Sequence, residues 1–123
     1  TPYKVLRRAR VAAGETVAVI GAGGGLGIHQ VMMAKWARTR VIAVDTRAAK
    51  FEACRKAGAD EVVDASAGRV TEQLLELTNG KGVDVVVDYV SATATLEAGA
   101  RALGRRAHHV PVVLLRKMMG ISA

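Results

Sequence analysis

The segment Thr16–Gly27, TVAVIGAGGGLG, constrains the fold more than any other part of the chain. It opens with an apolar run too short for a helix and too uniformly apolar for a half-exposed strand, which predicts a buried parallel strand. Five glycines follow, at positions 21, 23, 24, 25 and 27, and lead into a helical pattern over Gly25–Ala37. Glycine permits a sharp turn and leaves no Cβ between the backbone and a ligand. The strand, turn and helix start therefore predict a cradle for a phosphate or pyrophosphate.

The spacing of the glycines departs from a strict G-x-G-x-x-G pattern, because Leu26 stands where the third glycine would fall. Gly21-x-Gly23-x-x-x-Gly27 and Gly21-x-x-Gly24-x-x-Gly27 are both glycine-rich variants of a phosphate loop. The alternative is a tight turn without a ligand. Five glycines in seven residues exceed what such a turn requires.

A second apolar strand, Arg40–Asp45, ends in a carboxylate about twenty residues after the glycines, where a dinucleotide-binding fold places the acid that accepts from the adenosine ribose hydroxyls. A competing interpretation is that Asp45 caps a helix starting near Arg47. The glycine loop upstream favours the ribose interpretation.

Strands and helices alternate along the rest of the chain, which indicates right-handed βαβ units around a parallel sheet. The predicted fold is an α/β, Rossmann-like doubly wound parallel sheet in three layers, α/β/α. Pro111 lies inside the last apolar run and predicts an edge strand or an irregular segment. Further helices are predicted over Thr1–Arg10, Arg47–Ala57, Arg69–Thr78 and Thr93–Leu103, and further strands over Glu61–Asp64, Val83–Val90 and His108–Leu115. The exit of the first long helix lacks the usual glycine, and a left-handed Arg38 at that position would cost about 1 kcal/mol.

The length and composition predict one globular domain. The chain has 123 residues, half of them hydrophobic, which is enough to form one hydrophobic core. No apolar run is long enough to span a bilayer. Cys54 has no cysteine or histidine partner nearby, which predicts a buried residue in a reducing, cytoplasmic compartment. The net charge of +7 raises nucleic acid as a partner, but the basic residues are scattered and there are only four aromatic side chains, so a solvated basic surface is favoured.

The histidines carry little of the functional argument. His108 and His109 are adjacent on a predicted strand and point to opposite faces, which argues against a shared metal. His29 lies in the first turn after the glycines, within reach of a phosphate, but an ordinary surface position is favoured.

Several segments together resemble one protein family. GETVAVIGAGGGLGIHQVMMAK, RVIAVD, KAGADEVVD and GKGVDVVVDYV, in this order and spacing, resemble the coenzyme domain of the medium-chain dehydrogenase/reductase superfamily. Its members include zinc-type alcohol dehydrogenases and zinc-free quinone reductases. The resemblance extends from Thr1 to about Leu103, and it implies a Rossmann sheet, a nicotinamide cofactor and hydride transfer.

The resemblance also assigns cofactor-binding residues. Asp45 matches the ribose acid, Lys50 a basic residue that reaches the same ribose in some members, Val90 an apolar residue beside the cofactor, and Thr1 a threonine near the nicotinamide. Asp45 favours NAD, because a carboxylate repels a 2′-phosphate, and Arg47 keeps NADP as the weaker option. The pyrophosphate loop matches Gly21, Gly23, Gly24, Gly25, Leu26 and Gly27.

The sequence departs from the family in what it lacks. The catalytic domain, which supplies the zinc ligands and most of the substrate pocket, has no counterpart here, so residues 1–123 are expected to be the dinucleotide-binding domain of a longer dehydrogenase. Zinc is expected only in that other domain, if at all. No catalytic residue is predicted in this chain, which should bind cofactor with little or no turnover. The sixth strand of the family is also missing, which would leave a sheet edge open for self-association.

Two other functions fit the pattern. Gly23-x-Gly25-x-Gly27 followed by an acid after the second strand also describes an S-adenosylmethionine site, hence a methyltransferase-like domain. A nucleotide-binding association module without catalysis is the third interpretation. The segments GADEVVD and GVDVVVDYV favour the dehydrogenase.

Overall fold

The computed structural model describes residues 2–111, which form one parallel sheet covered by helices on both faces. The strands lie in the order β3-β2-β1-β4-β5, and every neighbouring pair is parallel. The strands are β1 (Thr16–Ile20), β2 (Arg40–Asp45), β3 (Glu61–Asp64), β4 (Val83–Asp88) and β5 (Leu103–Pro111). The helices are α1 (Pro2–Arg8), α2 (Gly25–Trp36), α3 (Phe51–Ala57), α4 (Val70–Leu77) and α5 (Thr93–Ala102), with a 3-10 turn η1 (Ala48–Lys50) before α3.

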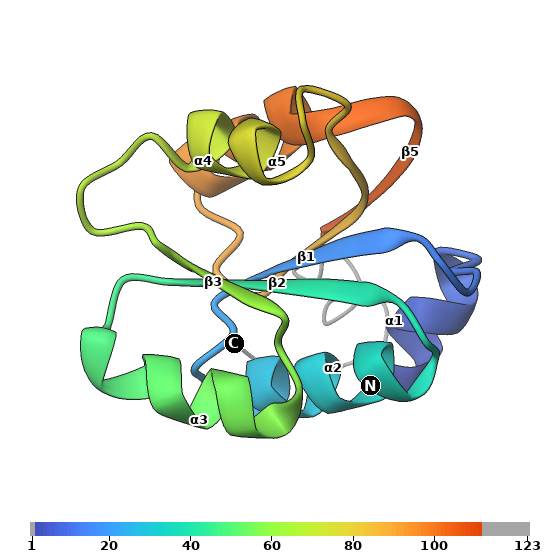
Figure 1. Ribbon diagram of the computed structural model, residues 1–123, viewed down its shortest axis with the longest axis horizontal. Coiled ribbons are helices and arrows are strands. Elements are labelled where there is room, and N and C mark those ends of the chain that lie inside the picture. The colour runs from blue at the N-terminus through green and yellow to red at the C-terminus, as the bar shows by residue number, and fades with distance from the viewer. Residues whose placement is uncertain (1, 112–123) are drawn as a thin grey trace.

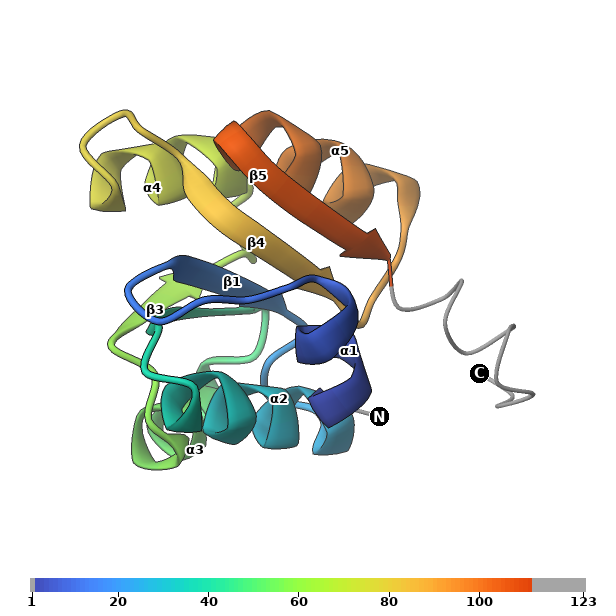
Figure 2. The same ribbon diagram turned by 90° about the vertical axis from the view of Figure 1, so that its right-hand side faces the viewer.

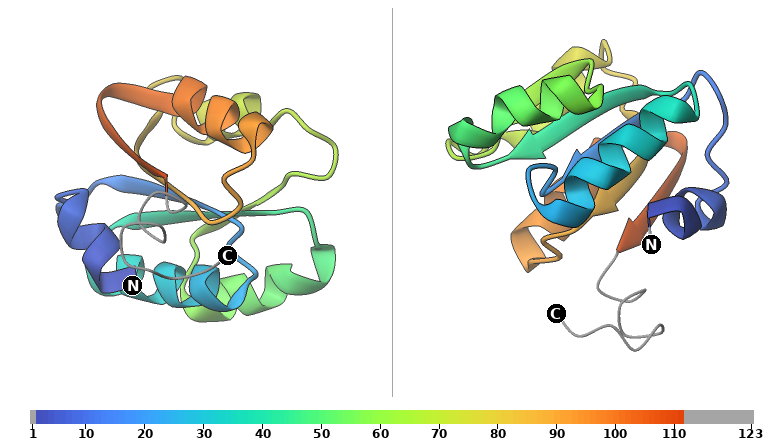
Figure 3. Two further views of the ribbon diagram at one scale, coloured as in Figure 1. Left: turned by 180° about the vertical axis from the view of Figure 1, so that it is seen from behind. Right: turned by 90° about the horizontal axis from the view of Figure 1, so that it is seen from below.

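The helices divide between the two faces of the sheet, so the predicted three layers are confirmed (Figure 1). Seen from below, α2 and α3 lie side by side on one face (Figure 3). Along β1, Val17 and Val19 pack toward α1, α2 and α3, while Ala18 and Ile20 pack toward α4 and α5. Both sets are buried because both faces are covered, which explains the continuous apolar runs of the strands.

The central strand β1 determines where a ligand could bind. It pairs with β2 on one side and with β4 on the other, and Figure 2 shows β1, β4 and β5 side by side. The chain adds β2 and β3 on one side of β1, then returns to add β4 and β5 on the opposite side. At such a switch point the loops after the two central strands separate, which opens a crevice at the carboxyl end of the sheet.

Some element boundaries differ from the prediction. The helix expected over Arg47–Ala57 is divided into η1 and α3. The helix predicted over Thr93–Leu103 ends one residue earlier, at Ala102, because Leu103 is already extended, with φ −68° and ψ 139°. Glycine at position 104 allows the backbone to pack closely against Lys81, because a Cβ there would lie 2.7 Å from the Lys81 carbonyl oxygen.

Other expectations are confirmed or lie partly beyond the described residues. Arg38 takes the left-handed conformation that was considered for the helix exit, with φ 63°. Strand β5 begins five residues before the predicted His108, and within residues 2–111 it pairs with β4 alone, at the sheet edge that Pro111 predicted. The rest of the predicted run, residues 112–115, lies outside the described residues. Cys54 is buried in the core, and its burial raises the pKa of the thiol.

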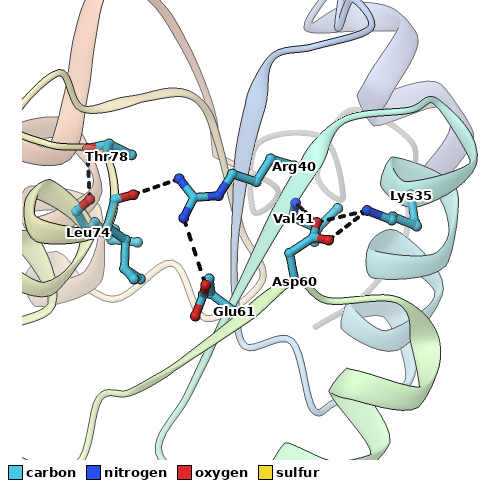
Figure 4. A network of polar contacts seen from close by, with 8 residues as sticks. Lys35, Arg40, Val41, Asp60, Glu61, Leu74 and Thr78 are labelled. Atoms are coloured by element: carbon cyan, nitrogen blue, oxygen red, sulfur yellow. Dashed lines mark hydrogen bonds and ion pairs between the residues drawn. The ribbon is translucent and has the colours of Figure 1, made fainter.

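A polar network joins the amino ends of β2 and β3 to the flanking helices (Figure 4). The Asp60 carboxylate accepts from the Val41 N–H at 2.8 Å and from Lys35 Nζ at 2.8 and 2.9 Å. Arg40 donates to the Leu77 carbonyl at 2.6 Å. Burial acts to raise the pKa of Asp60, but the hydrogen bonds from Lys35 and Val41 outweigh it, and the pKa lies below its usual value.

The outer surface carries a few large apolar side chains. Trp36, at the end of α2, is 75% exposed, and Tyr3 on α1 and Met32 on α2 are also exposed. Within residues 2–111, none of the helices combines the length and apolar character needed to cross a membrane.

Replacing Asp60 by Asn should make stability less dependent on pH. The folded-state pKa of Asp60 lies below the unfolded value of about 3.9, so its stabilisation is present above about pH 4 and is lost as the pH falls through the folded pKa. We expect Asp60→Asn to lower the free energy of unfolding by about 1 kcal/mol at pH 7, because the contact is partly exposed to solvent. Urea unfolding followed by circular dichroism should show this difference shrinking toward pH 3.

The matched control for this prediction is Glu52→Gln. Glu52 lies 4.0 Å from Arg55, and its side chain is 70% exposed, so its replacement should change stability little at any pH. A loss in Asp60→Asn that stays the same between pH 7 and pH 3 would contradict the assignment.

Candidate functional site

Three glycines of the loop are required by the fold. Gly21 has φ +79°, a left-handed conformation that glycine adopts without strain. A Cβ on Gly27 would lie 2.1 Å from the Gly21 carbonyl oxygen, and a Cβ on Gly23 would lie 2.5 Å from Lys50 Cβ. Helix α2 can therefore start against the end of β1 only because these positions carry no side chain.

The remaining two glycines face open space. A Cβ on Gly25 would meet nothing within 4 Å, and one on Gly24 would meet only the Gly21 carbonyl oxygen, at 3.6 Å. Both line a groove of about 460 Å³ together with Leu26. The first bond of α2 runs from Ile28 N–H to the Gly24 carbonyl at 2.9 Å, so the N–H groups before Ile28 have no acceptor within the helix. This end of α2 therefore suits an anion.

A second groove adjoins the first along the carboxyl ends of β1 and β2. Its volume is about 270 Å³, and its lining is mainly apolar, with Asp45 at one side. The two grooves share Gly21, Arg47 and Val90. Together they form an extended site at the switch point, with an apolar portion and a portion rich in backbone N–H groups.

Asp45 connects the glycine loop to the end of β2. It is only 4% exposed, and its Oδ2 accepts from the Gly23 N–H at 2.8 Å. Arg47 donates to the same carboxylate from its backbone N–H at 2.9 Å, from Nε at 3.0 Å and from a terminal guanidinium nitrogen at 3.1 Å. Burial acts to raise the pKa of Asp45, but these hydrogen bonds outweigh it, so the pKa is lowered and the group is ionised.

Arg47 covers the carboxylate from the solvent side. Its own side chain is 52% exposed, so it can move away without disturbing the core. The capping interpretation is wrong, because Arg47 itself is the N-cap of η1 and that segment has no side-chain cap hydrogen bond. The Asp45 carboxylate instead holds the turn through the Arg47 N–H and holds Gly23 through a contact that spans 22 residues. The helical segment begins only at Ala48, after this turn.

The structure brings most of the other predicted site residues to the same edge of the sheet. Lys50 packs against Gly23, and Val90, which is 54% exposed, lines both grooves. Thr1 lies outside the described residues. His29 is exposed, and its Nδ1 donates to the Gly25 carbonyl at 2.8 Å. Among the side chains that the structure describes, no three metal-ligating groups gather at one place.

The sequence reasoning missed Asp88 and the pairing of Arg47 with Asp45. Asp88 ends β4 just as Asp45 ends β2, and its carboxylate accepts from the Val90 and Ser91 N–H groups at 2.9 and 2.7 Å. The sequence signal for Asp88 was its position as an acidic residue at the end of β4, the buried strand that pairs with β1. Thr95, which also lines the second groove, has no distinguishing sequence signal.

A parallel sheet with this strand order, a glycine-rich loop after β1 and a buried acid after β2 define a Rossmann-like α/β domain. The comparison with known families is more specific. The chain belongs to the zinc-binding dehydrogenase family, whose family model matches residues 25–119.

Individual proteins agree with this assignment. An NAD-dependent alcohol dehydrogenase from Sulfurisphaera tokodaii is 36% identical over 115 residues, which cover 93% of this chain and 33% of that protein. The crystal structure of AibC has a TM-score of 0.83 and 35% identity, over 88% of this chain and 30% of that one. The Escherichia coli quinone oxidoreductase complexed with NADPH has a TM-score of 0.80 and 28% identity, over 94% and 39% respectively. The chain thus spans about a third of the length of each of these three proteins.

The two kinds of glycine predict a large loss of stability in one case and little change in the other when a methyl group is added. In Gly27→Ala the methyl would collide with the Gly21 carbonyl, and we expect the free energy of unfolding to fall by about 2–3 kcal/mol. In Gly25→Ala, the matched control on the same helix turn, nothing lies within reach, and stability should change by less than about 1 kcal/mol. Thermal and urea unfolding measure both variants, and equal losses would contradict the packing argument.

Proposed function

We propose that this chain is the NAD(P)-binding domain of an oxidoreductase that transfers a hydride between an alcohol or carbonyl substrate and a nicotinamide cofactor. The observation that carries the proposal is the link between the glycine loop and the strand-end acid, in which Gly23 donates to Asp45 beside two adjoining grooves. Family membership supports the same conclusion.

The residues fit a dinucleotide along the whole of the described edge. Diphosphate oxygens would be bound by the N–H groups of Gly25, Leu26 and Gly27 at the start of α2. The ribose hydroxyls would be bound by Asp45, with Lys50 beside it, and apolar contact would come from Val90. When bound, the cofactor supplies the hydride chemistry, while these residues bind and orient it.

The catalytic part of the enzyme is proposed to lie in a separate domain, because the chain matches about a third of the length of its relatives. Any zinc and the substrate pocket would belong to that domain. By itself the 123-residue chain should bind cofactor with little or no turnover, and dehydrogenase activity from this chain alone would contradict the proposal. The cytoplasmic location and the self-association through the sheet edge stay predictions.

NAD is the proposed cofactor and NADP the weaker alternative. The acceptor positions of Asp45 are already used by Gly23 and Arg47, so a ribose hydroxyl would take over a position from the exposed guanidinium. A 2′-phosphate would instead meet the carboxylate as a like charge and Arg47 as a partner. The balance between these two side chains therefore sets the preference.

The first test is a calorimetric titration with NAD, NADP and S-adenosylmethionine. We expect NAD to bind best, and Asp45→Asn, which keeps an acceptor for the Gly23 N–H, to lose about tenfold in NAD affinity because a charge-assisted hydrogen bond is removed. Asp64→Asn is the matched control, since Asp64 ends β3 but lines neither groove. Preferential binding of S-adenosylmethionine would establish the methyltransferase-like alternative, and binding of no nucleotide would favour the association module.

Replacement of Arg47 tests whether this side chain favours NADP over NAD. We expect Arg47→Ala to lower NADP affinity about tenfold through loss of the phosphate partner, while NAD affinity stays the same or rises because Asp45 is uncovered. Arg55→Ala, an exposed arginine on α3, should leave both affinities unchanged. An equal loss for NAD and NADP in Arg47→Ala would show that Arg47 does not discriminate between them.

A further inference from the structure

The turn after β4, residues 88–91, forms the wall between the two grooves. Val90 lines both grooves, and it approaches the glycine loop so closely that a Cβ on Gly21 would lie 3.1 Å from Val90 Cγ2. A ligand that extends from one groove into the other must pass this side chain. The position of Val90 relative to Gly21 therefore sets how the two grooves are aligned.

The carboxylate of Asp88 stabilises this turn through hydrogen bonds to its backbone. Its side chain is fully buried, and its Oδ1 accepts from both the Val90 and the Ser91 N–H groups. Ser91 is left-handed, with φ 55°, and its hydroxyl donates to the Asp88 carbonyl at 2.9 Å. The carboxylate thus stabilises a backbone conformation that a residue with a side chain rarely adopts.

The second carboxylate oxygen of Asp88 is buried at a cost in free energy that the hydrogen bonds of the turn do not offset. Oδ2 is buried and has no hydrogen-bond partner within the described residues. A buried acceptor without a partner is unfavourable. Unfavourable buried groups of this kind concentrate at functional sites, where geometry outweighs stability.

Tyr89 ties the turn to α2. Its hydroxyl donates to Oε1 of Gln30 at 2.7 Å, and Gln30 is fully buried. Gln30 lies about one turn beyond Gly27 on the helix whose start forms the phosphate cradle. The Tyr89 N–H also donates to the Ile20 carbonyl at 2.9 Å, just before the glycine loop. The wall is thereby joined to both ends of that loop.

We propose that Asp88 and the hydrogen-bonded pair Tyr89 and Gln30 are positioning residues that align the two grooves for a ligand that occupies both. The inference rests on the proposed function, since the ligand is a dinucleotide with an adenosine part, a diphosphate and a second ribose. A preformed wall lowers the cost of ordering the site on binding. The effect should appear in ligands that span both grooves and not in those that fill one.

The test compares ADP-ribose, which would span both grooves, with AMP, whose adenosine would occupy the second groove beside Asp45. Affinities are measured by calorimetry at a temperature where circular dichroism shows each variant folded. In Asp88→Ala we expect the ratio of ADP-ribose to AMP affinity to fall about tenfold, and in Tyr89→Phe about threefold, in keeping with loss of charged and neutral hydrogen bonds. Asp88→Asn, which keeps Oδ1, should restore the ratio to within twofold of the wild-type chain.

Tyr3→Phe is the matched control, because Tyr3 is an exposed tyrosine on α1 outside both grooves, and its ratio should not change. An unchanged ratio in Tyr89→Phe, or equal losses for both ligands, would overturn the positioning role. If Asp88→Ala does not fold, Tyr89→Phe and Asp88→Asn still decide the question. Failure of the wild-type chain to bind ADP-ribose or NAD would instead refute the proposed function itself.

Discussion

The contact between Gly27 and the Gly21 carbonyl is the constraint on which the candidate site depends. A methyl group at Gly27 would lie 2.1 Å from that oxygen, so α2 can begin directly at the end of β1 only with glycine there. This approach places the first turn of the helix, with its N–H groups, in the crevice where the strand order reverses. A more distant helix would still cover the sheet, but its N-terminus would not line the groove.

Much of the fold was predictable because the local and the global requirements agree. Strands β2 and β3 have the predicted bounds, Arg40–Asp45 and Glu61–Asp64, since each is a short β-branched or apolar run closed by polar residues. The start of β5 was not predictable, because the role of Gly104 comes from a contact with Lys81 that is distant in sequence. The glycine loop and Asp45 were also predicted as a pair, whereas the Arg47 ion pair depends on side-chain conformation, which spacing does not encode.

The two acids that end β2 and β4 show how one residue type serves two purposes at the same edge of the sheet. Asp45 lies at the groove wall, and within residues 2–111 its carboxylate accepts hydrogen bonds from Gly23, a fixed partner, and from Arg47, a partner that can leave. Asp88 is fully buried, and among the described residues its carboxylate accepts only from the turn that follows it. Asp45 is therefore suited to meet a ligand directly, while Asp88 acts on the shape of the backbone. Both depend on parallel strands that bring their carboxyl ends together.

The position of Trp36 has a spectroscopic consequence. It is the only tryptophan of the chain, and its side chain is already 75% exposed in the folded protein. Unfolding transfers little more of the indole into water, so the emission maximum of the native protein should already lie close to that of the denatured chain. Trp36 is also eleven residues beyond Gly25, about 16 Å along the axis of α2. A change in tryptophan fluorescence on adding a nucleotide would therefore report a movement of the helix rather than contact with the ligand.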